Sequence, residues 1–172
     1  CFKKIKEELG LTSIALAHHL SDQAETILMH IGRGSGLNGL VGMTEKSGYY
    51  IRPMLNVTKD EIMNYITKNN LKYVTDSTNN CVDYTRNFMR QNVVFEMQKV
   101  YPKLCENLYK LSKKVQEEND FLDSLIKKTW IKQVPGGVEI LETVATIESV
   151  LKNRVIIKAL KIMGASVDIE EK

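Results

Sequence analysis

The sequence predicts a helix-rich α/β fold, and three observations support this prediction. The chain has 172 residues, 43% of them hydrophobic and 26% charged, which is enough to bury a core and is unlike a disordered protein. Residues 13–17 (SIALA) form a short apolar run, which is typical of a strand in a parallel sheet covered on both faces. Apolar residues then recur at helical spacing, at Ala24, Ile27, Leu28 and Ile31. A strand followed closely by a helix is half of a β-α-β unit.

Short elements are expected on either side of this strand and helix. Residues 1–10 (CFKKIKEELG) predict an amphipathic helix, and residues 49–51 predict a short strand that Pro53 ends. Thr58 and Glu61 have the spacing of a capping box, which predicts the start of another helix. We expect the apolar side chains of that helix to be Ile62, Tyr65 and Ile66.

The second half of the chain predicts mostly helix. Residues 75–80 (TDSTNN) have the composition of a turn, because their side chains bond their own backbone. Two helices are expected after it, over residues 83–97 and 102–128. A β-hairpin is expected next, with strands at 130–134 and 138–141, followed by a helix over 146–163 that Gly164 ends.

This pattern contains too few strands for a complete parallel sheet. Only residues 13–17 have the composition of an interior strand, whereas such a sheet needs several. We therefore expect residues 1–97 to be the C-terminal half of a parallel-sheet domain whose first half lies upstream of Cys1. Residues 98–128 are expected to form a linker helix, and residues 129–172 the start of a small helical domain.

Several classes of protein are excluded by composition. No apolar run approaches the roughly 18 residues that span a bilayer, and the N-terminus does not resemble a signal peptide. The three cysteines are odd in number and widely spaced, which indicates reduced thiols rather than a zinc site. We expect a cytoplasmic protein without a membrane segment, and the sequence leaves a homodimer open.

Positive charge is concentrated in residues 84–114. This stretch carries seven basic residues against Glu96 and Glu106, namely Arg86, Arg90, Lys99, Lys103, Lys110, Lys113 and Lys114. On predicted helix, such a stretch could follow a phosphate backbone. A solvated helix face explains it equally well.

The segment GRGSGLNGLVG, residues 32–42, contains five of the ten glycines and spells G-x-G-x-x-G. A dinucleotide site would need a strand before this motif and a helix after it, but here a predicted helix precedes it. We therefore expect Gly32 or Gly34 to end that helix in a left-handed conformation. Arg33 either binds phosphate from this loop or interacts with the end of the helix dipole.

Two further groups of polar residues indicate a site. His18, His19, Asp22 and Glu25 follow the predicted strand, at the edge where open α/β sheets bind ligands. Asp22 could hold Mg²⁺ or position an amine there, or it could only cap the helix. Zinc is disfavoured because adjacent histidines on a strand point to opposite faces.

The second group is Arg86, Asn87 and Arg90. The two arginines are four residues apart and therefore lie on one helical face. They suit phosphates or an adenylate, although a salt-bridged surface is the alternative.

Taken together, residues 15–43, 51–55, 76–80 and 86–90 resemble the bacterial tRNA(Ile)-lysidine synthetases, which belong to the PP-loop ATP pyrophosphatase superfamily. The resemblance covers roughly residues 11–97 and is only architectural beyond them. It implies a ligase that uses ATP to adenylate the C2 carbonyl oxygen of the wobble cytidine in the CAU anticodon of tRNA(Ile). The ε-amine of L-lysine then displaces AMP, with Mg²⁺ and arginines balancing the phosphate charge.

The resemblance also implies roles for individual residues. Asp22 matches an acidic residue of the active site and is expected to position lysine or Mg²⁺. His18 and His19 match the same segment and are expected to shape the ATP pocket. Arg33 is expected to act in catalysis near the cytidine or its phosphates.

Arg86, Asn87 and Arg90 match the R-N-x-x-R segment of the family, which implies contact with the adenylate or the tRNA. The family's SGGxDS loop, which cradles pyrophosphate, is absent from this sequence. We therefore expect these residues to be an incomplete and inactive part of a longer enzyme. The alternatives are another PP-loop ATP pyrophosphatase, for tRNA 2-thiolation or amide formation, and a non-catalytic tRNA-binding fragment.

Overall fold

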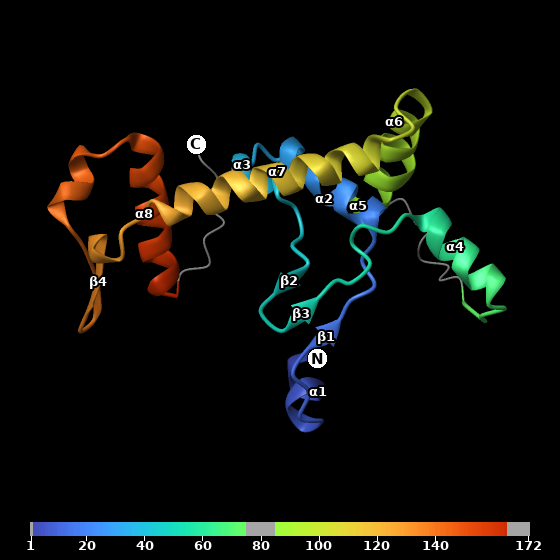
Figure 1. Ribbon diagram of the computed structural model, residues 1–172, viewed down its shortest axis with the longest axis horizontal. Coiled ribbons are helices and arrows are strands. Elements are labelled where there is room, and N and C mark those ends of the chain that lie inside the picture. The colour runs from blue at the N-terminus through green and yellow to red at the C-terminus, as the bar shows by residue number, and fades with distance from the viewer. Residues whose placement is uncertain (1, 75–84, 165–172) are drawn as a thin grey trace. The chain divides into compact units, whose positions relative to one another are not determined.

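The computed structural model describes residues 2–74 and 85–164. It divides into two compact units, Cys1–Lys113 and Lys114–Lys172, and each is described here by itself (Figure 1). The helix-rich α/β class expected from the sequence is confirmed. No helix among the described residues has both the length and the apolar character needed to cross a membrane.

The first unit begins with α1 (Phe2–Glu8) and a small three-stranded sheet. Strand β1 (Ile14–Ala15) pairs in parallel with β3 (Tyr50–Ile51), and β2 (Lys46–Ser47) pairs with β3 in the antiparallel direction. The parallel strand predicted over residues 13–17 is therefore confirmed in direction. The prediction that it is buried is wrong, because Ala15 is exposed and Ile14 only half-buried. Three two-residue strands carry too few side chains to cover one another.

Helix α2 (Leu20–Gly32) follows β1, as the apolar spacing predicted. It ends with Gly34 in the left-handed conformation, at a φ of +79°, which confirms one of the two expected positions. The glycine-rich segment then forms a short helix, α3 (Leu37–Leu40), which was not predicted. A helix and not a strand precedes the G-x-G-x-x-G spelling, so the dinucleotide interpretation is excluded.

Helix α4 (Lys59–Lys68) has the predicted capping box. The Glu61 N–H donates to Thr58 Oγ1 over 3.1 Å, and the Thr58 N–H donates to Glu61 Oε2 over 2.8 Å. The expected apolar face of this helix is not buried, since Tyr65 is 64% exposed and no residue of α4 is in the core. Its start is therefore fixed by capping rather than by packing.

A continuous helical segment replaces the single helix expected over residues 83–97. It consists of α5 (Thr85–Phe88), the π-helical turn η2 (Met89–Val94) and α6 (Phe95–Val100). Residues 75–84, and with them the predicted turn, lie outside the described residues. Helix α7 (Leu104–Ser124) follows and ends four residues before the expected position.

The core of the first unit joins α2, η2 and α7. It consists of Leu20, Ala24, Val94, Leu104 and Cys105, all of them buried. Cys105 is a free thiol, as expected. This core packs η2 against α2 and so brings side chains of the two segments close to one another.

The second unit contains the end of α7, the hairpin and the last helix. The hairpin has strands β4 (Ile131–Val134) and β5 (Gly137–Ile140), with Gly136 at a φ of +85° in the turn. Two 3₁₀ turns, η3 (Lys128–Trp130) and η4 (Glu142–Thr146), flank it. Helix α8 (Ser149–Ile162) therefore begins three residues later than predicted, and Gly164 follows it with the expected left-handed φ of +83°.

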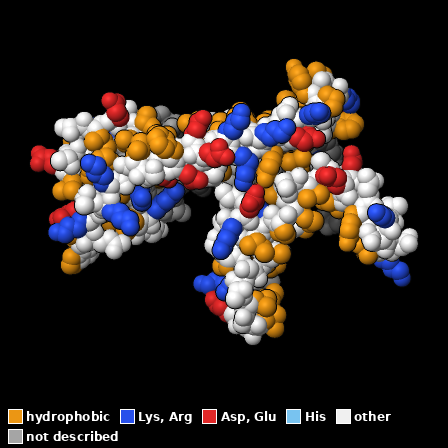
Figure 2. All heavy atoms as spheres, viewed as in Figure 1, with side chains coloured by type: hydrophobic (Ala, Val, Ile, Leu, Met, Phe, Trp, Pro, Cys, Tyr) orange, Lys and Arg blue, Asp and Glu red, His pale blue; other side chains and the backbone are white. Residues whose placement is uncertain are grey.

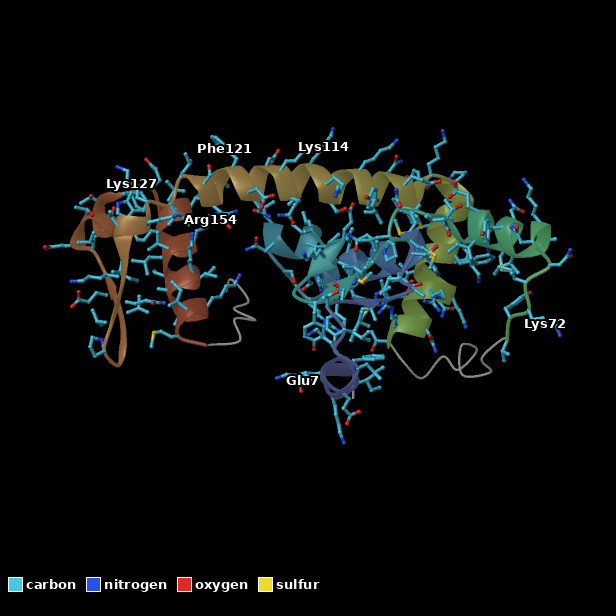
Figure 3. The ribbon with its side chains drawn as sticks, turned by 60° about the horizontal axis from the view of Figure 1, so that its bottom comes forward. Glu7, Lys72, Lys114, Phe121, Lys127 and Arg154 are labelled. Atoms are coloured by element: carbon cyan, nitrogen blue, oxygen red, sulfur yellow. The ribbon has the colours of Figure 1, made fainter. Side chains whose placement is uncertain are left out.

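This unit has its own small core of Ile126, Val144 and Val155. Arg154 of α8 points toward the end of α7, as Figure 3 shows. It donates to Asn119 Oδ1 over 2.5 Å and to Asp123 Oδ1 over 2.8 Å. These bonds attach α8 to α7 within the second unit.

Candidate functional site

The site begins with two acidic side chains near the start of α2. Asp22 is the third helical residue, where its carboxylate accepts a hydrogen bond from the His19 backbone N–H over 3.0 Å. Glu25 lies one turn further on the same face. Asp22 is 8% exposed and Glu25 has no exposed surface, so both carboxylates need charged or hydrogen-bonding partners within the protein.

Two arginines from the α5–η2 segment supply those partners. Arg90 donates through Nε to Glu25 Oε1 over 2.6 Å and through Nη2 to Glu25 Oε2 over 3.0 Å. The same Nη2 lies 3.0 Å from Asp22 Oδ1. Arg86 donates through Nε to Glu25 Oε2 over 3.0 Å, and its Nη2 lies 3.6 Å from Asp22 Oδ1. The four side chains form one cluster, here called the acid–arginine cluster.

The cluster contains two negative and two positive charges, and the four groups differ in access to solvent. The Glu25 side chain is fully buried, while the side chains of Arg86 and Arg90 are 40% and 35% exposed. Glu25 raises the pKa of Arg90 above its ordinary value, mainly through their hydrogen bond. The arrangement can therefore present two fixed guanidinium groups to an anion, with a buried counterion behind them.

The two histidines lie beside the same carboxylate. His19 Nε2 is 3.5 Å from Asp22 Oδ2, and His18 Nδ1 accepts a hydrogen bond from Arg52 Nε over 3.3 Å. Burial lowers the pKa of His18, and the nearby Arg86, Arg52 and His19 lower it further against the opposing effect of Asp22. His18 is therefore held in its neutral form near pH 7.

The arrangement does not favour Asp22 as a ligand of Mg²⁺. One of its oxygens accepts from the His19 N–H and the other from Arg90. Within the described ranges, no group of three or more His, Cys, Asp or Glu side chains is arranged to hold a metal ion. The carboxylate is positioned instead by protein donors, and its remaining lone pairs can accept a hydrogen bond from a ligand.

The remaining residues of the expected site are distributed differently. Asn87 is half-buried and lies next to Arg86 in α5. Arg33 is the C-cap residue of α2 and is exposed. It follows Asp22 by eleven positions, which is about 16 Å along a helix axis. The structure therefore brings Asp22, His18, His19, Arg86 and Arg90 together but places Arg33 at the other end of α2.

The basic stretch expected over residues 84–114 is not an uninterrupted positive surface. Arg86 and Arg90 face the buried carboxylates of α2. Lys99 pairs with Glu96 at 2.7 Å, and Lys113 pairs with Glu45 at 2.9 Å. On the face shown in Figure 2, acidic as well as basic side chains lie along α7.

Glu25 was grouped with Asp22 in the sequence analysis but was given no role in the site, although it is the most buried member of the cluster. The spacing of the charged residues was the signal for such a role. The acidic pair Asp22 and Glu25 is spaced by three, the pair Arg86 and Arg90 by four, and both spacings place two side chains on one helical face.

Comparison with known proteins assigns the chain that carries this site to a family. Residues 1–97 match the PP-loop domain family. The tRNA(Ile)-lysidine synthase of Bacteroides thetaiotaomicron is 36% identical over 140 residues, which cover 81% of this chain and 33% of that protein. The corresponding enzyme of Chlorobaculum tepidum is 31% identical over 171 residues, covering 96% and 52% of the two chains.

The tRNA(Ile)-lysidine synthase of Bacillus subtilis is 38% identical over 130 residues, covering 73% of this chain and 28% of that protein. The chain thus spans about half the length of these relatives or less. The family match covers more than half of the chain and includes both helical segments of the acid–arginine cluster. The chain belongs to the PP-loop domain family.

Proposed function

We propose that this chain is part of the catalytic domain of a tRNA(Ile)-lysidine synthase. The observation that carries the proposal is the acid–arginine cluster, since its two halves come from two of the segments that resemble these enzymes. The names of the relatives favour lysidine synthesis over tRNA thiolation, amide formation or a non-catalytic RNA-binding role.

The proposed substrates are ATP, L-lysine and tRNA(Ile) with a CAU anticodon. ATP would adenylate the C2 oxygen of the wobble cytidine and release pyrophosphate. The C2 oxygen would then leave as part of AMP, which is a far better leaving group than hydroxide. Asp22 would bind and orient the ε-ammonium group of lysine, because a fixed carboxylate at the edge of the cluster attracts a cation. The ammonium group would then lose a proton before its nitrogen attacks C2 and AMP leaves. Arg86 and Arg90 would neutralise negative charge on the phosphate of the adenylate.

Other residues form part of the same proposal. His18 and His19 would line the ATP pocket, Asn87 would contact tRNA beside Arg86, and Arg33 would contact the tRNA from the glycine-rich loop. Mg²⁺ would accompany the ATP phosphates rather than bind Asp22, whose oxygens already have protein donors. Residues 98–128 would act as a linker helix, and residues 129–172 would begin a small tRNA-binding domain.

The test uses the complete gene product that contains this chain and measures ATP-dependent transfer of labelled lysine to tRNA with a CAU anticodon. We expect transfer by the wild-type protein and about a hundredfold slower transfer by Asp22→Asn, with tRNA affinity retained. Asp60→Asn is the matched control, because Asp60 is also in the first turn of a helix but is exposed. Absence of transfer by the wild-type protein would reject the proposal.

A further inference from the structure

Gln23 is next to Asp22 in sequence but contacts a different part of the protein. Its side chain is fully enclosed, with 1% of its surface exposed. Its Nε2 donates to the carbonyl oxygens of Val41 and Met43 over 2.8 and 3.1 Å, and its Oε1 accepts from the Met43 N–H over 2.7 Å. Gln23 is thus bonded to the far end of the glycine-rich segment.

The backbone of the glycine-rich segment leaves room for the Gln23 amide at Gly42. Gly42 lies between the two bonded residues and has a φ of +61°, which L side chains rarely adopt. A Cβ added at Gly42 would lie 2.8 Å from Gln23 Oε1, 2.9 Å from its Nε2 and 2.9 Å from Ile27 Cγ1. Glycine at position 42 therefore allows the backbone to approach Gln23 closely enough for these bonds.

A second side chain of α2 bonds the middle of the same segment. His30 Nδ1 is 2.8 Å from the carbonyl oxygen of Gly39, and the Ser35 N–H donates to the His30 carbonyl over 3.0 Å. Residues 34–43 thus leave the end of α2, turn and run back along it to Gln23. Ser112 of α7 also lies close to this amide, with its Oγ 3.3 Å from Gln23 Nε2.

We propose that Gln23 is a positioning residue that holds residues 34–43 against α2 and so fixes how this loop and Arg33 meet the tRNA. The part of this proposal that concerns tRNA rests on the function proposed above. A glycine-rich loop loses more backbone entropy on ordering than other sequences, so a buried side chain with several hydrogen bonds is needed to keep it in one conformation. Gln23 also places this anchor one residue from Asp22, on the same turn of α2.

Proteolysis of the complete gene product tests the anchor without reference to activity. Trypsin cleaves after exposed Arg33, at the start of the loop, and after exposed Lys72, which is labelled in Figure 3 and serves as an internal reference. We expect Gln23→Leu to raise cleavage after Arg33 relative to Lys72 by about tenfold, because the loop opens more often when its buried bonds are lost. An unchanged ratio in a folded variant would overturn the proposal.

Gln23→Glu is the second variant, in case the leucine variant fails to fold. It keeps the volume and the acceptor for the Met43 N–H but places a carboxylate against two carbonyl oxygens, so the ratio should rise again. Asn119→Leu is the control for general destabilisation, since Asn119 is a buried amide of the second unit, 5% exposed. It should lower stability and leave the Arg33 to Lys72 ratio unchanged; an equal rise in this control would also refute the anchor.

Kinetic measurements on the complete gene product separate this positioning role from a merely structural one. Both Gln23 variants should raise the KM for tRNA about tenfold and leave the KM for ATP within about twofold. Equal increases in both constants would contradict a role specific to the loop. If the wild-type protein transfers no lysine, the proposed function fails, while the proteolysis ratio still decides whether Gln23 anchors the loop.

Discussion

Replacing Glu25 with glutamine removes one charge from a side chain that has no exposed surface. The change keeps the size of the side chain but leaves Arg86 and Arg90 with Asp22 as their remaining acidic partner in the acid–arginine cluster. It also places an amide NH₂ group among guanidinium donors, where at least one donor loses its acceptor. The cluster then carries a net positive charge inside the first unit.

The expected loss of stability depends on how far Glu25 and the two arginines are buried. Removing one partner of a buried ion pair costs about 3–5 kcal/mol, because the other charge stays buried and unpaired. Here the arginine side chains are 40% and 35% exposed, so water screens part of the loss. We therefore expect Glu25→Gln to lower the free energy of unfolding by about 3 kcal/mol, a large part of the 5–15 kcal/mol typical of a domain.

Urea unfolding at pH 7, followed by circular dichroism, measures this change as a shift of the midpoint at constant slope. Glu45→Gln is the matched control, because Glu45 also accepts bonds from a lysine and a tyrosine but has 58% of its side chain exposed. Exposed pairs contribute about 0–1 kcal/mol. If Glu25→Gln costs no more than Glu45→Gln, the buried cluster does not organise the first unit and the reasoning fails.

Two other predictions concern the capping box and His18. Thr58→Ala should weaken the start of α4 by about 1 kcal/mol and speed hydrogen exchange in its first turn roughly fivefold, because α4 has no buried residue to compensate; unchanged exchange would contradict this. Burial lowers the pKa of His18 below 6.5 in the folded state, so the unfolded chain takes up the proton first as the pH falls. Stability should therefore decrease below about pH 6.5, and His18→Asn should reduce that decrease in urea titrations at pH 5.5 and 7.5; an identical pH dependence in the variant would refute the assignment.

Local signals in the sequence predicted most of the elements. The apolar spacing of α2, the capping box of α4 and the glycines around the β4–β5 hairpin each depend on residues a few positions apart. The predictions of burial failed for a different reason. Strand β1 was expected to be buried, and the helix after Thr58 was expected to use Tyr65 in its apolar face, but burial depends on what packs against an element and not on its own sequence.

The sequence singled out Asp22, Arg86 and Arg90 but did not predict how they contact one another. Asp22 and Arg33 were both expected to act in catalysis, and they lie near opposite ends of α2, about 16 Å apart along its axis by helical rise alone. This separation was predictable, because the predicted helix already joined the two residues. The pairing of Asp22 with Arg90 was not predictable in the same way, since 68 positions separate them in the chain.

The packing of α2 against η2 brings Asp22 and Arg90 together. Ala24 and Val94 both belong to the core of the first unit, at 0% and 3% exposure. A methyl side chain at position 24 leaves room for η2 to pack against α2, and Asp22 and Glu25 precede and follow it in the sequence of α2. Arg90, four positions before Val94, then meets both carboxylates. A larger residue at position 24 would separate the helices and break the ion pairs together, so the small core residue is as necessary to the cluster as the charges themselves.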